Sequence, residues 1–171
     1  LDDDGGVMHI SAFTKLMGCG LRLGFGAFPE SARESLSKVG FGLAPSHLTS
    51  MAVHEYLKDN KSAYVSGVAA SLGRKRDAML RSLGEYFPPT CTWTEPQGGM
   101  MIWMKLPEGT NTWDILEKSV EKGVKYNPGP IFRADRSGGN HLRLTFSHHT
   151  PDEIEEGIAV LAGVFEGEGV I

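Results

Sequence analysis

A helical stripe of apolar residues extends over residues 62–86, and two consecutive prolines, Pro88 and Pro89, end it. Proline has no backbone N–H and its ring collides with the preceding turn, so the helix cannot continue past this pair. A shorter periodic run, over residues 45–58, precedes it. The pattern therefore predicts two helical runs in succession, of which the second is long. The apolar positions of the second run recur at the spacing of one helix face: Tyr64, Val65, Val68, Leu72, Met79, Leu80 and Leu83.

Strand-like segments lie on both sides of these helical runs. They are short, apolar or alternating, and glycine turns separate them, as is typical of strands. The Gly18-Cys19-Gly20 turn reverses the chain between the first two, and the Gln97-Gly98-Gly99 turn pairs the third with the fourth. Five segments fit this description: residues 7–13, 21–28, 91–94, 100–106 and 141–147.

Three further segments carry the signals of helix ends. Residues 29–38 begin with a proline in the first turn, and residues 112–122 are capped by Asn111 or Thr112 and ended by Gly123. Helices that alternate with strands predict an α/β fold. The last helix has an N-cap, a proline at its first position and a capping-box glutamate: Thr150, Pro151 and Glu153. Its expected buried stripe consists of Ile154, Ile158, Leu161, Ala162 and Phe165.

The length and composition are those of an ordinary globular chain. With 171 residues, the chain has the size of one domain or of a large piece of a bigger one. Hydrophobic residues make up 40% and charged residues 22%, which excludes the disordered, collagenous and disulfide-rich classes. The net charge is −4 and no basic stripe occurs, so nucleic acid is not an expected partner. No run of apolar residues is long enough to predict a membrane span.

Cysteine and histidine usage predicts no metal site. Cys19 and Cys91 lie far apart without a CxxC pattern, and this usage is typical of a reducing, cytoplasmic location. His54 begins an HExxH-like pattern, but Lys58 stands where the second histidine is required. The chain starts with Leu1 and three aspartates, not with Met or a signal peptide, so we expect a fragment or a processed chain.

The densest chemical signal lies in residues 11–24. Lys15 and Arg22 stand there among apolar, small and hydroxyl residues, where a surface loop would be more polar. Gly18 and Gly20 disfavour a helix, so only a chain reversal brings the two side chains together. Burial and a neighbouring cation would both disfavour the ammonium form of the lysine, leaving an amine able to form a Schiff base. The alternative is two solvated surface charges. A dinucleotide fingerprint is excluded because the glycines do not follow GxGxxG.

Residues 11–24 resemble the lysine motif of class I and II aminotransferases, the fold-type I enzymes that use pyridoxal phosphate. Three further stretches resemble other motifs of that family, in the family's order: residues 95–103, 127–132 and 140–147. The similarity is greatest to the branch that contains aromatic-amino-acid, kynurenine and 2-aminoadipate aminotransferases. The resemblance implies the C-terminal part of a fold-type I enzyme. Its expected parts are the end of the large-domain sheet in residues 1–60, and a connecting helix with an α+β small domain in residues 61–171.

The resemblance also assigns roles to five residues. Lys15 would form the internal aldimine with the cofactor and then move the proton between the substrate's α-carbon and the cofactor. Arg22 would bind the cofactor phosphate, with Thr14 adding a hydroxyl and Ser11 supplying a second one. Arg143 would bind the substrate α-carboxylate through a bidentate contact, which fixes the orientation of the α-carbon.

Two positions depart from the family's lysine motif. Ala12 stands where the family often has serine, and Cys19 where it has proline, and both changes bear on cofactor affinity. The resemblance implies an enzyme of amino acid biosynthesis that moves an amino group from an α-amino acid to a 2-oxo acid. Residues 43–50 resemble a segment near the family's dimer interface, which implies a homodimer. The isolated portion is expected to be inactive, because the family's residues that contact the cofactor ring precede the lysine.

Three other interpretations share the lysine motif. The chain is compatible with the effector-binding domain of a transcriptional regulator, which would lie downstream of a winged helix-turn-helix. It is also compatible with a lyase or synthase of the same fold, because those reactions begin with the same Schiff base. The third interpretation is a folded remnant without chemistry, which would bind no cofactor.

Overall fold

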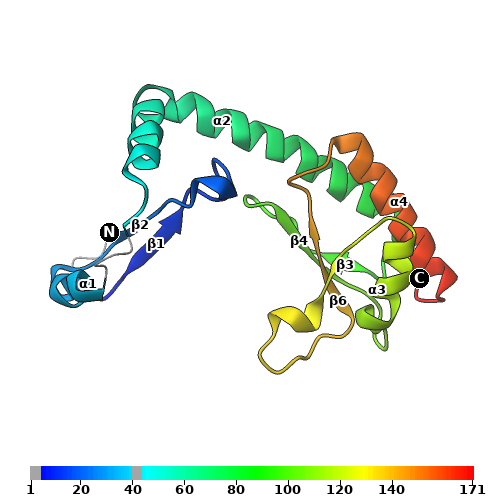
Figure 1. Cartoon of the computed structure of the whole chain (residues 1–171). Coiled ribbons are helices and arrows are strands. Elements are labelled where there is room, and N and C mark those ends of the chain that lie inside the picture. The colour runs from blue at the N-terminus through cyan, green and yellow to red at the C-terminus, as the bar shows by residue number, and fades with distance from the viewer. Residues whose placement is uncertain (1–4, 40–43) are drawn as a thin grey trace. The chain divides into compact units, whose positions relative to one another are not determined.

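The computed structural model describes residues 5–39 and 44–171. The chain forms two compact units, Leu1–Val68 and Ala69–Ile171. The boundary between them lies inside the long helix α2, His47–Tyr86 (Figure 1). Among the described residues, no helix combines the length and the apolar character that crossing a bilayer requires. The domain division at residue 60 stays a prediction.

The first unit contains a β-hairpin followed by short helices. Strands β1 and β2 pair antiparallel, with His9 opposite Ala27 and Ala12 opposite Gly24, so the predicted chain reversal is confirmed. The strands are shorter than predicted because residues on both sides of the glycine turn join the loop. Among the described residues of this unit, Val53 is the one buried hydrophobic side chain. The elements are β1 (His9–Ala12), η1 (Cys19–Leu21), β2 (Gly24–Ala27), η2 (Glu30–Ala32) and α1 (Arg33–Val39).

Helix α2 is one continuous helix of 40 residues where the sequence pattern predicts two runs. The expected break is wrong for a physical reason. The residues between the two runs, Asp59, Asn60 and Lys61, interrupt the apolar stripe but include no glycine or proline. The Asn60 side chain even donates a hydrogen bond to the Tyr56 carbonyl within the helix, at 2.9 Å. The polar residues therefore interrupt the apolar sequence pattern, but the helical backbone continues through them.

The second unit is a four-stranded antiparallel sheet with helices on one face. The strand order is β3-β4-β6-β5, so β6 lies between β4 and β5 although it follows both in sequence. The predicted β3–β4 pair, α3 and α4 are confirmed. The two-residue strand β5 is not predicted, because Pro128 lies in it and two residues carry no alternation. The elements are β3 (Thr92–Trp93), β4 (Met101–Lys105), α3 (Thr112–Glu121), β5 (Asn127–Pro128), η3 (Gly129–Phe132), β6 (His141–Thr145) and α4 (Pro151–Gly167).

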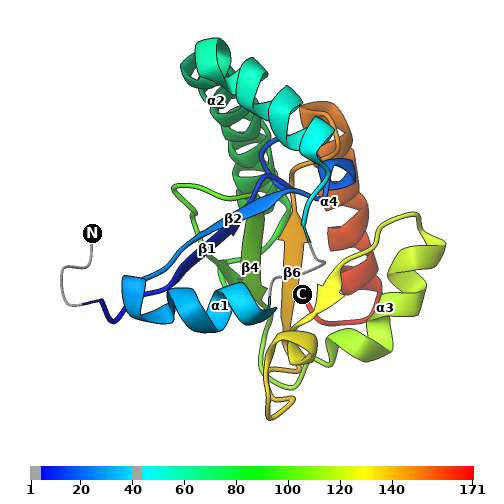
Figure 2. The same ribbon diagram turned by 60° about the vertical axis from the view of Figure 1, so that its left-hand side comes forward.

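The core of the second unit lies between the sheet and helices α2, α3 and α4 (Figure 2). Burial alternates along β4 and β6, so every second side chain faces this core and the others face away from it. The predicted helix ends are confirmed as well, since Asn111 caps α3 and Thr150 forms a complete capping box with Glu153. The core residues of the sheet are Ile102, Met104, Leu142 and Leu144, and those of α4 include Ile154, Ile158, Leu161 and Phe165.

Candidate functional site

Three of the predicted site residues lie in the hairpin loop of the first unit. The Phe13 backbone N–H donates to the Leu23 carbonyl at 3.0 Å and closes the loop just beyond the strands. Thr14, Lys15 and Arg22 lie inside the loop that this bond closes, and Ser11 lies on the adjoining strand β1. The hydroxyls, amine and guanidinium that the sequence singles out thus come from one short stretch of backbone.

Backbone hydrogen bonds give the loop its local shape. The Phe13 carbonyl accepts from the backbone N–H groups of Leu16 and Met17, at 3.1 and 2.8 Å, and this tight turn contains Lys15. From α2, the Tyr64 hydroxyl donates to the Leu16 carbonyl at 2.9 Å and ties the turn to the helix. At the other end of the loop, Arg22 has a left-handed backbone with φ of 49°, an uncommon conformation for a residue with a side chain.

Gly24 is required at the start of β2 by its close approach to β1. A Cβ atom at this position would lie 2.8 Å from the Ser11 carbonyl oxygen, closer than such contacts occur. Glycine therefore allows the two strands to pair directly beneath the loop. The strand pairing in turn sets where Ser11 and Arg22 emerge from the hairpin.

Lys15 is exposed in the part of the chain that the structure describes, so the burial expected from its apolar surroundings is not observed there. The reason is that no second layer of described residues covers the two-stranded hairpin. Among the described residues, neither Lys15 nor Arg22 forms an ion pair with a carboxylate. Lysine, arginine and threonine side chains are all of the kinds that donate hydrogen bonds to an anion such as a phosphate.

Arg143 belongs to the second unit and lies on the sheet face that is turned away from the core. It is half-buried in β6, with Trp103 of β4 opposite on one side and Asn127 of β5 on the other. Its Nε atom is buried and has no hydrogen-bond partner. Its Cζ atom lies over the face of the Phe132 ring, 4.2 Å from the ring centre, within the range of a cation–π contact.

Aromatic residues around Arg143 form a group that the sequence analysis missed. Trp103 meets the Phe132 ring edge-on, with 5.7 Å between ring centres, and its other neighbour is the stacked His141 ring at 5.6 Å. Partial burial lowers the pKa of His141, and the cations of Arg133 and Lys105 add to this effect. The signal that finds this group is the alternation of β4 and β6, which places Trp103, His141 and Arg143 on one face.

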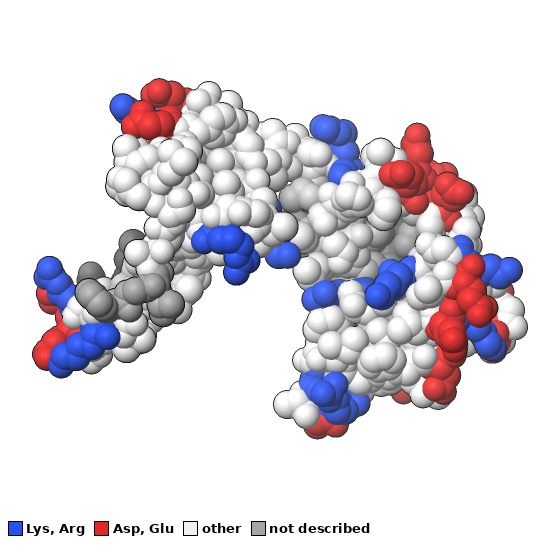
Figure 3. Space-filling model, in the orientation of Figure 1, with Lys and Arg blue, Asp and Glu red and all other residues white. Residues whose placement is uncertain are grey.

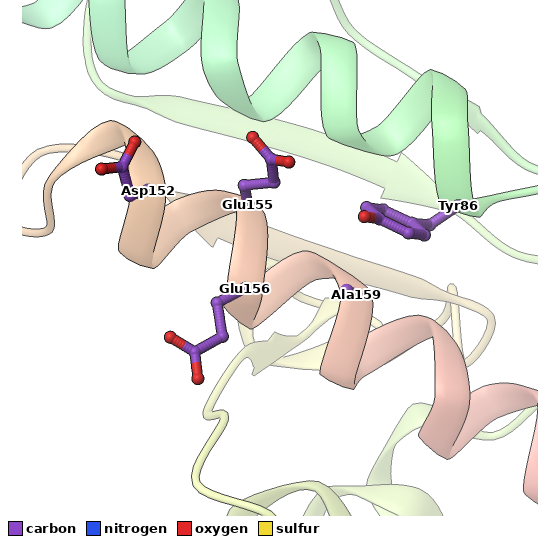
Figure 4. Close-up of a pocket in the computed structure, with 5 residues that line it drawn as sticks. All are labelled: Tyr86, Asp152, Glu155, Glu156 and Ala159. Atoms are coloured by element: carbon purple, nitrogen blue, oxygen red, sulfur yellow. The ribbon is translucent and has the colours of Figure 1, made fainter.

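Surface charge excludes one pocket of the second unit as an anion site. A pocket of about 300 Å³ lies between α2 and α4, where Figure 4 shows Glu155 and the Tyr86 ring directed into the space between the helices. Asp152 and Glu156 also line it, and acidic side chains gather over α4 in Figure 3. Three carboxylates repel phosphates and carboxylates. Among the described residues, no three His, Cys, Asp or Glu side chains are grouped to bind a metal ion.

Crystal structures of known aminotransferases share this fold. The structure superimposes on a crystal structure of α-aminoadipate aminotransferase from Thermus thermophilus in complex with N-(5'-phosphopyridoxyl)-L-leucine, with a TM-score of 0.89 and 33% identity. The match covers 95% of this chain and 42% of that one. Kynurenine aminotransferase from Pyrococcus horikoshii, crystallised with PMP, gives a TM-score of 0.90 at 31% identity, over 98% of this chain and 42% of its own. The fold is thus that of part of a fold-type I pyridoxal-phosphate transferase.

Proteins with similar sequences include members of the same class as the structural matches. The model of the family "Aminotransferase class I and II" matches residues 1–161, and the chain belongs to this family. Aromatic-amino-acid aminotransferase 1 of Thermococcus litoralis is 34% identical over 98% of this chain and 41% of its own length. The chain therefore spans about two fifths of the length of such relatives. A helix-turn-helix transcriptional regulator of Bacillus subtilis, YisV, is also similar, at 29% identity over 95% of this chain and 34% of its own length.

Proposed function

We propose that the protein is an aminotransferase that uses pyridoxal phosphate to move an amino group from an α-amino acid to a 2-oxo acid. The observation that carries the proposal is the closed hairpin loop, which holds the Lys15 amine and the Arg22 guanidinium without an acidic partner among the described residues. The family membership and the ligands of the similar crystal structures, N-(5'-phosphopyridoxyl)-L-leucine and PMP, support the cofactor. The chemistry that the bound cofactor supplies is an aldehyde that reacts with amines and a ring that accepts electrons.

Lys15 is the proposed catalytic residue. It is the only lysine within the described loop, so its primary amine is the only lysine amine there. The turn at Phe13 fixes its backbone. A lysine performs two tasks in such chemistry. Its Nζ would hold the cofactor, and as a free amine it would accept the proton from the substrate α-carbon and donate it to the cofactor carbon that becomes protonated.

Arg22, Thr14 and Ser11 are the proposed phosphate ligands. The guanidinium of Arg22 can donate two parallel hydrogen bonds to a phosphate, which a lysine at this position would not reproduce. Its left-handed backbone sets the direction in which the side chain leaves the loop. The hydroxyls of Thr14 and Ser11 add neutral donors, and Ser11 compensates for the hydroxyl that Ala12 lacks.

Arg143 is the proposed ligand of the substrate α-carboxylate. Its Nε is buried without a partner, an arrangement that costs free energy unless a ligand accepts the hydrogen bond. A carboxylate would accept from Nε and one terminal nitrogen together, and this bidentate contact would exclude water from the same groups. The contact would also hold the α-carbon in one orientation during proton transfer.

A homodimer is part of the proposal. At the beginning of α2, Leu48 is 81% exposed and Met51 is exposed too, and both lie in or beside the segment 43–50 that resembles the family's dimer interface. Leu43 itself lies outside the described residues. Apolar side chains exposed in one place are commonly covered by a partner. We further propose a role in amino acid biosynthesis, since the relatives' names include aromatic-amino-acid and 2-aminoadipate aminotransferases, and a cytoplasmic location, which the cysteine usage favours.

Reduction with borohydride tests the proposal in the full-length protein. The expected result is a pyridoxyl group on the peptide that contains Lys15, detected by mass spectrometry, and its loss in Lys15→Arg. The matched control is Lys58→Arg, since Lys58 is an exposed lysine of the same unit. A stable adduct on a different lysine, or no adduct on cofactor-saturated protein, would defeat the assignment.

The second candidate function is the effector domain of a transcriptional regulator, which the similarity to YisV favours. A measurement of catalytic turnover distinguishes the aminotransferase from the effector domain. An aminotransferase produces a new amino acid from a 2-oxo acid and an amino donor, whereas a regulator binds the cofactor without such turnover and shifts DNA fragments in a gel. A lyase or synthase would release product from the amino acid alone, without a 2-oxo acid.

A further inference from the structure

The guanidinium of Arg143 lies over an aromatic ring and, among the described residues, is not paired with a carboxylate. Its Cζ atom lies 4.2 Å from the centre of the Phe132 ring. A cation is attracted to the face of an aromatic ring by the ring's quadrupole. Stacking uses the flat face of the guanidinium, whereas its N–H groups lie in the plane and point outward from the edge. A contact through this face does not use the N–H groups of Arg143, and its buried Nε has no hydrogen-bond partner.

Phe132 is in turn held by its neighbours. It is the last residue of η3, a short helix that directly follows strand β5, and the residue is 42% exposed. Trp103 contacts it edge-on at an interplanar angle of 79°. The His141 ring stacks on Trp103 with an interplanar angle of 26°. The rings of His141, Trp103 and Phe132 thus form a row that ends at Arg143. Edge-to-face and stacked contacts have preferred geometries, so this row restricts where the Phe132 ring lies.

We infer that Phe132 is a positioning residue for carboxylate recognition, which acts through Arg143 and is itself held by Trp103 and His141. The inference rests on the proposed function, since it assumes that Arg143 binds the substrate carboxylate. An acidic residue in place of Phe132 would also hold the guanidinium, but it would occupy the N–H edge and compete with the ligand. A ring holds the cation and leaves that edge free.

The inference predicts that removing the ring weakens binding of carboxylates but not of uncharged analogues. In the full-length protein saturated with cofactor, the probes are 3-phenylpropanoate and its amide, and calorimetry measures their dissociation constants. Phe132→Leu keeps the apolar character and loses the ring, so it should weaken carboxylate binding about 2- to 10-fold. Phe132→Tyr keeps the ring and should bind like the unchanged protein. Trp113→Leu is the matched control, because Trp113 is an exposed ring of the same unit that lies elsewhere, on α3.

Combination with Arg143→Gln separates this inference from the proposed function. Arg143→Gln alone should weaken carboxylate binding about 10- to 100-fold, in the range of a charged hydrogen bond. Phe132→Leu should then cause no further loss, since it acts through the arginine. An unchanged affinity in Arg143→Gln would overturn the carboxylate role of Arg143. A loss in that single variant together with an equal effect of Phe132→Leu on both backgrounds, or on the amide, would overturn the positioning role alone.

Discussion

At the scale of single residues, the backbone determines how the loop around Lys15 presents its side chains. Gly24 permits a close approach to Ser11, and Arg22 adopts a left-handed conformation at the opposite end of the loop. The glycines around Cys19 predict a reversal of the chain, and the hairpin confirms it. The conformation of Arg22 is not predictable from its residue type, because residues with a Cβ rarely adopt it. Tertiary contacts such as the Tyr64–Leu16 hydrogen bond impose the loop's shape instead.

Gly24→Ala should impair cofactor binding in the full-length protein. The new Cβ would lie 2.8 Å from the Ser11 carbonyl oxygen, so β1 and β2 would have to separate beneath the loop. An overpacking cost of about 1–3 kcal/mol corresponds to roughly 5- to 150-fold weaker binding of pyridoxal phosphate, measured by absorbance titration. Gly6→Ala is the control, since a Cβ at Gly6 meets no atom within 4 Å. Equal affinities for the two variants would contradict the structural role of Gly24.

At the scale of elements, helix α4 shows local sequence and structure in agreement. The Glu153 carboxylate accepts a hydrogen bond from the Thr150 backbone N–H at 2.7 Å, and the Thr150 hydroxyl accepts one from the Glu153 backbone N–H at 3.3 Å. These bonds satisfy backbone groups that a helix start leaves without partners. The hydrogen bonds from Thr150 lower the pKa of Glu153. The carboxylate thus stays ionised, and keeps its capping role, to a lower pH than an ordinary glutamate.

Thr150→Ala should destabilise the second unit by about 1 kcal/mol, the usual cost of losing an N-cap side chain. Urea unfolding followed by circular dichroism measures the change in the free energy of unfolding. Thr150→Ser keeps the hydroxyl and should restore most of the stability. If serine destabilises the protein as much as alanine does, the cap is not the source of the effect.

The elements that the sequence predicts correctly are those with strong local signals, and the errors have physical causes. α3, α4 and the β3–β4 pair are confirmed because caps, glycine turns and alternation all lie within a few residues. The continuity of α2 is missed because polar residues interrupt the apolar stripe although the backbone stays helical. Strand β5 is missed because it has no local sequence marker and forms only through its pairing with β6. The aromatic row beside Arg143 is missed because it joins residues from three separate segments.

At the scale of the whole molecule, the hydrophobic core is concentrated in one unit. Every buried hydrophobic side chain of the described residues except Val53 belongs to Ala69–Ile171. In this unit, Phe165 packs against Phe87 and Tyr126, and Leu83 is fully buried. In the first unit, both strands of the hairpin expose apolar side chains such as Ile10 and Phe25. Among the described residues, the second unit therefore supplies most of the hydrophobic burial that stabilises the fold.

A polypeptide of residues 69–171 should fold by itself, because it contains its own core. We expect a single cooperative thermal transition by circular dichroism, whereas residues 1–68 alone should show none. Leu83→Ala within the shorter polypeptide should reduce the free energy of unfolding by about 2–5 kcal/mol, since Leu83 is fully buried. A gradual, non-cooperative transition of residues 69–171, or an unaffected transition in Leu83→Ala, would show that the core needs more of the chain.

The continuity of α2 also determines where the chain is vulnerable to cleavage. The boundary between the units, at Val68 and Ala69, lies inside one uninterrupted helix, not in a loop. Proteases bind their substrates in an extended form, and a helix must locally unwind before it enters such a cleft. Limited proteolysis would thus attack other segments before it reached this junction, and digestion would give fragments that do not correspond to the two units.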